Sequence, residues 1–192
     1  HYDRNLGKGY AVKAGSLAAH GAWVALVDAD LDLDPGSIPA FLAAARDDDL
    51  DLAIGSKRHP ESIVHYPRSR RAASWCYQQL NRALFRLDVR DTQVGLKVFR
   101  RQVIADILPY CVERRFVLDV EILALANRLG YRRILAAPIS LYRVDRSTVT
   151  ARAVVRMFGD TLRLAWRLRT RAGYPLPRAT PADAPASARP DP

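Results

Sequence analysis

The chain has 192 residues, enough for one ordinary domain with its own hydrophobic core. Hydrophobic residues make up 49% and charged residues 26%, a composition that excludes a disordered or fibrous chain. The formal net charge is +10, from 30 Lys plus Arg against 20 Asp plus Glu, and this excess indicates an anionic partner: nucleic acid, a phosphorylated substrate or an acidic lipid surface.

The first third of the chain alternates between helix and strand patterns. A glycine turn and a helix are expected in NLGKGYAVKAGSLAAHG (5–21), a buried strand in AWVALVDAD (22–30), a helix capped near Ser37 in DPGSIPAFLAAARDDD (34–49), and a second apolar strand in LDLAIGSKR (50–58). This alternation predicts an α/β fold with a mostly parallel sheet flanked by helices.

The pattern continues to residue 171. We expect a helix over 68–87, a loop and short strand in DTQVGLKVFRR (91–101), an amphipathic helix in DVEILALANRLGY (119–131), a strand in RRILAAPISLYR (132–143), and a long helix in TARAVVRMFGDTLRLAWRLRTR (150–171). The Pro/Ala-rich end cannot build a core and is expected to be disordered. We therefore divide the chain into a domain over 1–148, a basic helix over 149–172 and a tail over 173–192.

Four aspartates follow the first strand at a spacing of two: Asp28, Asp30, Asp32 and Asp34. Ligands bind outside the carboxyl ends of strands in α/β sheets, and in an extended segment the first three carboxylates project to the same side. Crowded carboxylates repel one another unless a cation neutralises them, and hard oxygen ligands suit Mg²⁺ or Mn²⁺. The alternative is a solvated acidic turn that caps the next helix, which Asp34 before Pro35 would suit.

Several segments together resemble family 2 glycosyltransferases of the GT-A fold. NLGKG precedes a hydrophobic strand and DAD, and IGSKRH, RDTQVGLKVFRR and VERRFVLDVEIL follow in the order seen in the polyprenyl-phosphate branch, the dolichyl-phosphate glucose and mannose synthases. RDTQ with VER…DVE looks more like the glucosyl members. The resemblance implies a GT-A-like, Rossmann-like domain that apparently lacks the family's N-terminal strand–helix–strand unit, which holds the nucleobase and ribose.

The resemblance also implies a reaction. A hexose, glucose in the first place, would pass from UDP-glucose to a polyprenyl (dolichyl-type) phosphate, with inversion at the anomeric carbon. Asp28 and Asp30 would hold Mg²⁺ or Mn²⁺, with Asp32 as a further neighbour, and the metal would stabilise the charge of the leaving diphosphate. The acceptor phosphate is already anionic near neutral pH, so no strong general base is required.

The remaining site residues come from the same motifs. As catalytic residues we expect Asp28, Asp30, Asp91 and Gln93; for donor binding Lys8, Asp28, Asp30 and Asp119; for the acceptor phosphate Lys57, Arg70, Ser74 and Arg143. Structural alternatives stay open for most of them. Asp91 and Gln93 also suit a turn, Asp119 and Glu121 also suit the start of a helix, and the basic residues also suit a solvated loop.

The long final helix is amphipathic. Arg152, Arg156, Arg163 and Arg167 fall in a narrow sector, and a broad apolar sector away from them holds Met157, Phe158, Leu162, Ala165 and Leu168. Such a helix can lie in an anionic membrane interface, which predicts peripheral association with the cytoplasmic face of a membrane. Alternatively, the apolar face packs on the domain and the arginines are solvated.

Other features limit the remaining possibilities. Cys76 and Cys111 have no metal-ligand spacing, which favours two thiols in a reducing cytosol, and no apolar stretch reaches the roughly 18–20 residues of a membrane span. The start HYDRNLGKGY has no methionine and no signal peptide, so the chain is expected to be the later part of a longer product. Rival functions are a nucleotidyltransferase, a glycosyltransferase with a sugar-hydroxyl acceptor, and an inactive membrane-associating fragment. Nucleic acid is not expected as a partner, because the basic residues lack an interleaved aromatic platform.

Overall fold

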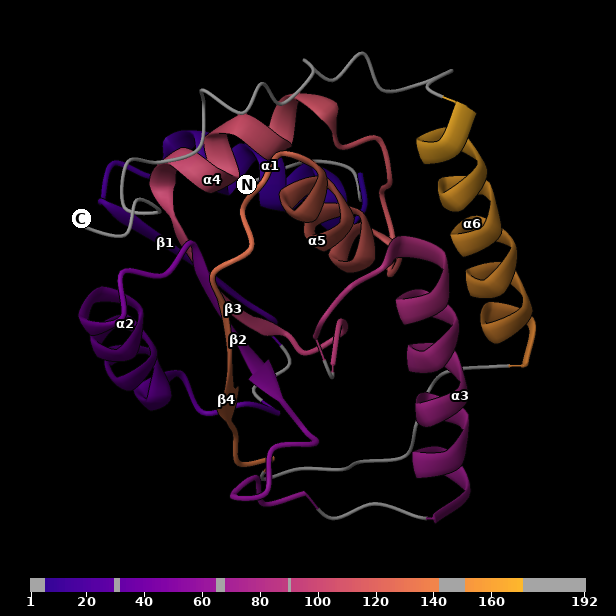
Figure 1. Ribbon diagram of the computed structural model, residues 1–192, viewed down its shortest axis with the longest axis horizontal. Coiled ribbons are helices and arrows are strands. Elements are labelled where there is room, and N and C mark those ends of the chain that lie inside the picture. Colours follow the sequence, from indigo (N-terminus) through magenta and orange to yellow (C-terminus); the bar gives the residue numbers. More distant parts are fainter. Residues whose placement is uncertain (1–5, 30–31, 65–67, 90, 142–150, 171–192) are drawn as a thin grey trace, which may run out of the picture.

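A four-stranded sheet lies between layers of helices in the computed structural model, which describes residues 6–29, 32–64, 68–89, 91–141 and 151–170, without the side chains of 68–72 and 151 (Figure 1). The strands are β1 (Trp23–Val27), β2 (Leu52–Ser56), β3 (Leu96–Arg100) and β4 (Ile134–Pro138). The helices are α1 (Lys8–Ala18), α2 (Ile38–Asp47), α3 (Arg68–Phe85), α4 (Arg101–Ile107), α5 (Leu118–Arg128) and α6 (Ala151–Thr170), with short 3₁₀ turns at Pro35–Ser37 and Leu108–Tyr110. The tail expected to be disordered lies outside the described residues.

The sheet has the strand order β1-β3-β2-β4. Strands β2 and β4 are parallel, with Leu52 opposite Ile134, whereas β3 is antiparallel to both β1 and β2. Strands β1, β2 and β4 therefore run in one direction and β3 runs against them. The expected α/β sheet flanked by helices is confirmed, and β3 is its antiparallel member.

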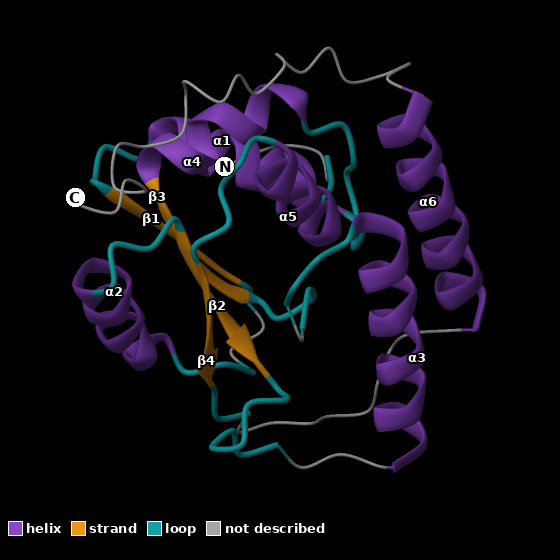
Figure 2. Ribbon diagram, in the orientation of Figure 1, coloured by secondary structure: helices purple, strands orange, loops and turns teal. Residues whose placement is uncertain are grey.

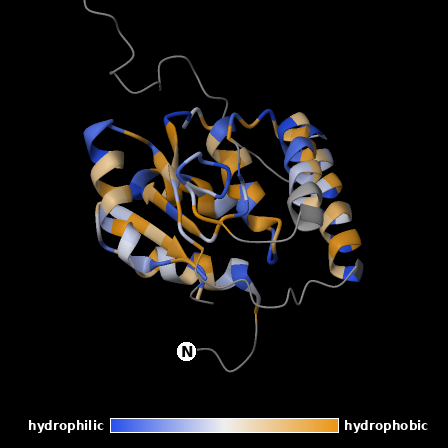
Figure 3. Cartoon of the chain, turned by 90° about the horizontal axis from the view of Figure 1, so that it is seen from below, coloured by the Kyte–Doolittle hydropathy of each residue, from blue (hydrophilic) through white to orange (hydrophobic). Residues whose placement is uncertain are grey.

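Alternate residues of the strands face different helices, as the twofold period of a strand requires. Leu52 and Ile54 belong to the core shared with α4 and α5, while Ala53 and Val98 face Phe41 of α2 on the other side. Both sides of β2 are buried, which explains its nearly continuous apolar sequence. Figure 2 shows these strands in the middle of the molecule, and in Figure 3 the middle of the molecule is coloured mostly as hydrophobic.

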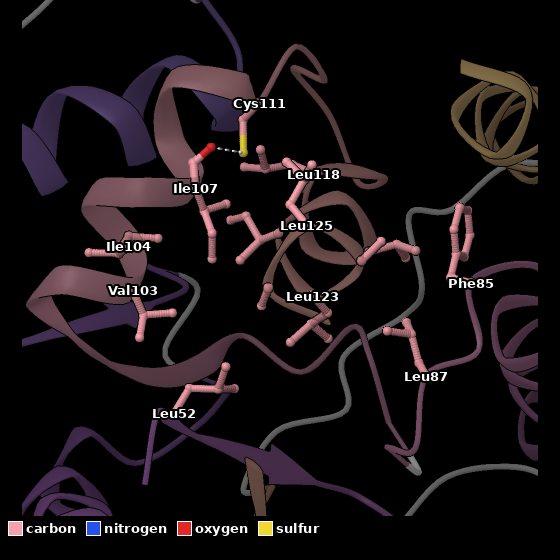
Figure 4. Packing of buried hydrophobic residues seen from close by; sticks show 14 of the residues in the cluster. Leu52, Phe85, Leu87, Val103, Ile104, Ile107, Cys111, Leu118, Leu123 and Leu125 are labelled. Carbon is pink, nitrogen blue, oxygen red and sulfur yellow. Dashed lines mark hydrogen bonds between the residues drawn. The ribbon is translucent and has the colours of Figure 1, made fainter. Parts of the chain in front are cut away.

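The larger core cluster lies between the sheet and helices α4 and α5 (Figure 4). Val103 and Ile107 of α4 are fully buried together with Leu118 and Leu125 of α5. Each such side chain contributes roughly 1.5–3 kcal/mol through burial. The Cys111 thiol donates to the Ile107 carbonyl at 3.6 Å. Helix α4 was not expected from the sequence, because its seven residues are too few to show a helical period.

Helices α3 and α6 lie side by side and complete this half of the molecule (Figure 1). The Tyr77 hydroxyl is 2.7 Å from Thr161 Oγ1, and the Tyr77 ring meets Phe158 edge to face at 5.4 Å between centroids. Leu164 is fully buried, but Leu162 is 53% exposed. Leu162 therefore belongs to the part of the expected apolar sector that faces away from the domain, because α6 turns only a narrower side toward it.

The turn before α2 is built by Asp34. Its carboxylate accepts a hydrogen bond from the Gly36 N–H at 2.8 Å, and the Ser37 hydroxyl donates to the Asp34 carbonyl at 2.6 Å. Ser37 is the N-cap residue of α2, as expected, but its hydroxyl points back to Asp34, so α2 has no side-chain cap. Asp34 thus has a structural role that separates it from the aspartates nearer β1.

Candidate active site

The ends of three strands meet at one edge of the sheet. Asp28 follows β1, Lys57 follows β2, and Gly95 precedes β3, which begins at this edge because it runs against its neighbours. The Asp28 N–H donates to the Gly95 carbonyl at 3.0 Å. A Cβ atom at Gly95 would overlap the Asp28 carboxylate, so this close approach requires glycine.

Four charged side chains form an alternating row across this edge. The Lys8 ammonium lies 2.9 Å from Asp28 Oδ1 and 2.8 Å from Asp119 Oδ2. The other Asp119 oxygen accepts from Lys97 Nζ at 2.7 Å, and Lys97 also donates to the Val94 carbonyl at 2.5 Å. Lys97 and Asp119 are buried, whereas Lys8 and Asp28 are about one-third exposed. The row, hereafter the Lys97–Asp119–Lys8–Asp28 row, therefore leads from the core to the surface.

The protonation of this row is set by its pairing. Burial disfavours the charge of Asp119, but Lys97 and Lys8 outweigh it and hold the pKa of Asp119 below its ordinary value. Burial likewise opposes the charge of Lys8, yet Asp119 and Asp28 raise the pKa of Lys8 above its ordinary value. Both groups are consequently charged at neutral pH.

Lys8 is held in place by the glycines on either side of it. Gly7 has a φ of 87°, and the Gly9 N–H donates to the Arg114 carbonyl at 3.2 Å. A Cβ at Gly7 would collide with the Arg114 carbonyl, and one at Gly9 with that of Glu113. The NLGKG segment therefore packs directly on the backbone before α5, which brings Lys8 to the first turn of that helix.

The backbone before α5 is itself fixed by Glu121. This carboxylate is fully buried and accepts the N–H groups of Val112 and Glu113, both at 2.9 Å. From the sequence, Asp119 and Glu121 also suited acids that merely begin a helix. They do lie in the first turn of α5, but Asp119 pairs with lysines while Glu121 organises the preceding turn.

A second group surrounds Asp91, which is buried. Asp91 Oδ2 accepts the Lys57 N–H at 3.2 Å and lies 3.8 Å from the Lys57 ammonium. Its Oδ1 accepts the Gln93 N–H at 3.3 Å. The Gln93 amide reaches Met157 Sδ of α6 at 3.5 Å. The structure thus brings Lys57, Asp91 and Gln93 together. The bond between Asp91 and the Gln93 N–H is also the one that a turn at Asp91 would form.

The loop that carries Asp91 is anchored to α3 by residues that the sequence analysis did not name. Gln78 donates to the Val89 carbonyl at 2.8 Å and accepts from the Thr92 N–H at 3.2 Å. Asn81 reaches Thr92 Oγ1 at 3.4 Å. Polar residues on the buried side of a helix were the only sequence signal for this anchor.

Other predicted site residues are placed only in part. Asp30 and Arg143 lie outside the described residues, and the Arg70 side chain is not described. Ser74 is half-buried on α3, and Asp32 is half-buried in the turn after β1. Lys97, which the sequence analysis named only within a motif, is the buried end of the row. Its signal was a charge at an inward position of an apolar strand.

Two hollows border the row. One of about 520 Å³ lies against α1 and β1 and is lined by Asp28, Gly95, Lys97 and Asp119 among others. The second, of about 580 Å³, is lined by Leu6, Gly7, Lys8, Arg114, Arg115 and Phe116. Lys8 lines both, so it stands between a hollow lined by paired lysines and aspartates and a basic one.

The residues at the strand edge suit a divalent cation. Asp28 offers a hard oxygen donor at the edge, and its Oδ1 already holds a cationic group, the Lys8 ammonium. Within the described residues no three His, Cys, Asp or Glu side chains cluster as a complete metal site. Asp28 with Asp32 would therefore supply only part of a ligand set, and substrate phosphates complete such sites in other proteins.

Known proteins share this sequence pattern. Residues 1–108 match the family described as "Glycosyl transferase family 2". Glycosyltransferase AglD of Haloferax volcanii is 30% identical over 89% of the chain and 27% of its own length. A dolichyl-phosphate beta-glucosyltransferase of Saccharomyces cerevisiae is 31% identical over 76% of the chain, and one of Dictyostelium discoideum is 29% identical over 85%. The chain spans about half or less of the length of these relatives (27%, 47% and 52%).

Solved structures share the fold. Glucosyl-3-phosphoglycerate synthase from Mycobacterium tuberculosis, in complex with phosphoglyceric acid, matches with a TM-score of 0.62 at 17% identity, over 91% of the chain and 58% of that structure. The same enzyme in complex with Mn²⁺ and UDP-glucose matches with a TM-score of 0.60.

The α/β sheet and the matching structures show the GT-A fold. More particularly, the chain belongs to glycosyltransferase family 2, as the match over more than half of its length shows. The family that the motifs resemble is thereby confirmed.

Proposed function

We propose that the chain transfers a hexose, in the first place glucose from UDP-glucose, to a polyprenyl phosphate, with inversion at the anomeric carbon. The observation that carries the proposal is Asp28, a carboxylate at the end of β1 whose Oδ1 holds an ammonium at 2.9 Å. The relatives named dolichyl-phosphate beta-glucosyltransferase support the substrate class. The Mn²⁺ and UDP-glucose bound in a structural relative support a metal and this donor.

The residues around Asp28 would divide the work. Asp28, Asp30 and Asp32 would hold Mg²⁺ or Mn²⁺, which supplies electrostatic stabilisation of the leaving diphosphate. Lys8 would bind the donor phosphates, since lysine is a compact cation with three donors. Asp119 would act on the donor through Lys8. Asp91 is buried and held by two backbone N–H groups, so it can accept hydrogen bonds from sugar hydroxyls in one fixed orientation.

The acceptor would bind on the other side of the Asp91 loop. Lys57 lies beside Asp91 at the end of β2, and the first turns of α3 carry Arg70 and Ser74. Arg143 is included from the sequence alone. A phosphate acceptor is already anionic near neutral pH and needs orientation rather than deprotonation. Since the leaving group departs in the same displacement, the product would have the inverted configuration.

Helix α6 would bring the site to a membrane. Val155, Leu162 and Trp166 form an exposed apolar stripe, with exposed fractions of 72%, 53% and 60%. Exposed Arg152, Arg156 and Arg163 lie alongside it, and the opposite side of α6 packs on α3. None of the described helices is both long and apolar enough to cross a bilayer. We propose peripheral association with anionic lipid at the cytoplasmic face, where the free thiols of Cys76 and Cys111 also belong.

The test is transfer from radiolabelled UDP-glucose and GDP-mannose to polyprenyl phosphate with Mg²⁺, Mn²⁺ or EDTA. The chain and an N-terminally extended version are assayed side by side, each also with water-soluble sugar and phosphoglyceric acid acceptors. We expect metal-dependent formation of glucosyl lipid. Transfer to a soluble acceptor alone would overturn the lipid acceptor, and no transfer by either folded protein would overturn the proposed activity.

A further inference from the structure

We propose that Lys8 is an internal counter-cation that moves between Asp28 and the anionic substrate, and that the buried Asp119–Lys97 pair positions it for this exchange. The inference rests on the proposed function, because it takes a divalent cation to bind at Asp28. It adds a role for two residues, Asp119 and Lys97, at a distance from the reacting atoms.

The geometry of Lys8 is that of a shared cation. Its ammonium lies between Asp28 Oδ1 at 2.9 Å and Asp119 Oδ2 at 2.8 Å. Asp28 is 36% exposed and Asp119 only 7%, so a cation from solvent reaches Asp28 and not Asp119. A divalent cation on Asp28 would repel the ammonium at this distance. Lys8 would then leave Asp28 but remain bound to Asp119.

Lys97 makes Asp119 a fixed partner. Lys97 belongs to the inner strand β3, and its side chain is 2% exposed. Its ammonium donates to Asp119 Oδ1 at 2.7 Å and to the Val94 carbonyl at 2.5 Å. Because Lys97 uses one oxygen and compensates the buried charge, Asp119 keeps its other oxygen directed at Lys8. Without this pair, Asp28 would be the remaining carboxylate within reach of Lys8 in the row.

A second hollow lies beside the Lys8 ammonium and can receive it when it leaves Asp28. Lys8 also lines the hollow with Arg114, Arg115 and Phe116, whose described lining contains no acidic residue. Neither arginine forms an ion pair with any residue that the structure describes. When the Lys8 ammonium leaves Asp28, it therefore adds positive charge beside a basic hollow. A diphosphate there would be bound by Lys8 and by the two arginines.

The exchange couples the two ligands. The two lysines and two aspartates of the row neutralise one another. A divalent cation at Asp28 leaves an excess of two positive charges, which a nucleoside diphosphate can offset. Metal binding would thus prepare the site for the donor, and the donor would hold the metal.

The experiment measures Mn²⁺ affinity by electron paramagnetic resonance, without nucleotide, and UDP affinity by calorimetry with saturating Mn²⁺. For Lys8→Met, and for the second variant Lys8→Gln, we expect Mn²⁺ to bind at least about fivefold more tightly, because a competitor is gone, and UDP to bind about tenfold more weakly. The matched control is Lys13→Met on the same helix, since Lys13 bonds the Cys111 carbonyl and lines neither hollow. It should leave both affinities unchanged.

The positioning pair is tested by Lys97→Met/Asp119→Asn, in which neither buried charge is left alone. Lys8 then has only Asp28, so Mn²⁺ should bind several-fold more weakly, and adding Lys8→Met should restore tight binding. A purely structural role would not produce this reversal. Circular dichroism confirms that each variant is folded before its affinity is read.

The possible failures are distinguishable. Unchanged or weaker Mn²⁺ binding by folded Lys8→Met and Lys8→Gln would overturn the counter-cation, even if the wild type makes glucosyl lipid. An unchanged affinity in the double variant would overturn the positioning role. The expected shifts without any sugar transfer would overturn the proposed function alone, and no Mn²⁺ binding by the wild type would overturn both.

Discussion

Lys97 is a charged residue in the middle of a buried strand. Among the described residues, Asp119 is the carboxylate that neutralises its charge. Removing one member of a buried pair costs about 3–5 kcal/mol, whereas removing both is often close to neutral. Asp119→Asn leaves Lys97 without a counter-charge and should destabilise the fold by about 3–5 kcal/mol. Lys97→Met should cost less because Asp119 keeps Lys8. Urea unfolding at pH 7 measures these free energies.

The double variant Lys97→Met/Asp119→Asn supplies the control. It should recover most of the stability lost in Asp119→Asn, because no buried charge remains unpaired. Equal losses in the double variant and in Asp119→Asn would contradict the pairing. A loss below about 1 kcal/mol in Asp119→Asn would do the same.

The contribution of Asp119 and Lys8 to the free energy of unfolding depends on pH with a definite sign. The pKa of Asp119 is lowered from 3.8, so its stabilisation is complete above that value and is lost as the pH falls through the lowered pKa. The pKa of Lys8 is raised from 10.5, so its contribution is present below that value and lost as the pH rises through the raised pKa. The stability difference between wild type and double variant should therefore be constant near neutral pH and change only toward strong acid or base.

Gly95 is a second residue whose role follows from close approach. In Gly95→Ala, the new Cβ would displace the Asp28 carboxylate, so we expect sugar transfer and Mn²⁺ affinity to fall at least tenfold. Gly159→Ala is the control, because Gly159 lies in α6 with open space around its Cα, lines neither hollow and should gain about 0.5–1 kcal/mol. Equal activity of the two variants would contradict the placement of Asp28 against Gly95.

The sequence was informative about some residues of this site and silent about others. The acids after β1 and the glycines around Lys8 belong to motifs, so Asp28 and Lys8 were predicted. The Lys97–Asp119 bond was not, because it joins a strand and a helix whose packing no local pattern encodes. Lys97 could be found only as a charge at an inward strand position.

At the level of elements, the reactivity of the two thiols depends on how the chain packs around them. Cys76 lies on α3, and Cys111 lies in the turn after α4. Cys76 is exposed, whereas Cys111 is 1% exposed and burial, with a smaller effect of Glu121, raises the pKa of its thiol. A thiol reagent at pH 7.5 should modify one cysteine of the folded chain and both after denaturation. Cys76→Ser should then show no fast reaction. Two fast thiols in the native wild type would contradict the core of Figure 4.

The exposed stripe of α6 carries its own prediction. Leu162→Gln/Trp166→Gln should reduce binding to vesicles that contain phosphatidylserine by at least about tenfold, because burial of each side chain is worth roughly 1.5–3 kcal/mol. Unfolding should hardly change, since both side chains are exposed. Leu17→Gln on α1, where Leu17 is 78% exposed, is the control. Equal binding by all three proteins would contradict a membrane role for α6.

The elements themselves were predictable to different degrees. The four strands that the structure describes are short apolar runs, and the five longer helices have apolar residues at helical spacing, so each was expected near its observed place. Helix α4 was missed because it is short, and the direction of β3 was not evident because a strand's period is the same in both directions. The side of α6 that packs on α3 is fixed by the contact between Tyr77 and Thr161. A helical wheel of α6 alone contains no information about this contact.

For the whole molecule, the antiparallel insertion of β3 has a consequence for function. It brings the loop of Asp91 to the edge where β1 and β2 end, so the proposed metal site, the proposed sugar site and the basic hollow share one edge of the sheet. Helix α6 touches this loop through Met157 and presents its apolar stripe outward. A lipid-borne phosphate and a soluble nucleotide sugar could then approach from different sides.

The most direct measurement is the initial rate of Mn²⁺-dependent glucosyl transfer to polyprenyl phosphate by the wild type, Asp28→Asn and Asp47→Asn. Asp47 ends α2, is exposed and lies away from the site, so it is a matched loss of one carboxylate. We predict that Asp28→Asn loses at least about 10²-fold in rate while remaining folded, and that Asp47→Asn keeps the wild-type rate. A wild-type rate in Asp28→Asn, or a rate that EDTA does not reduce, would contradict a metal-dependent site at Asp28.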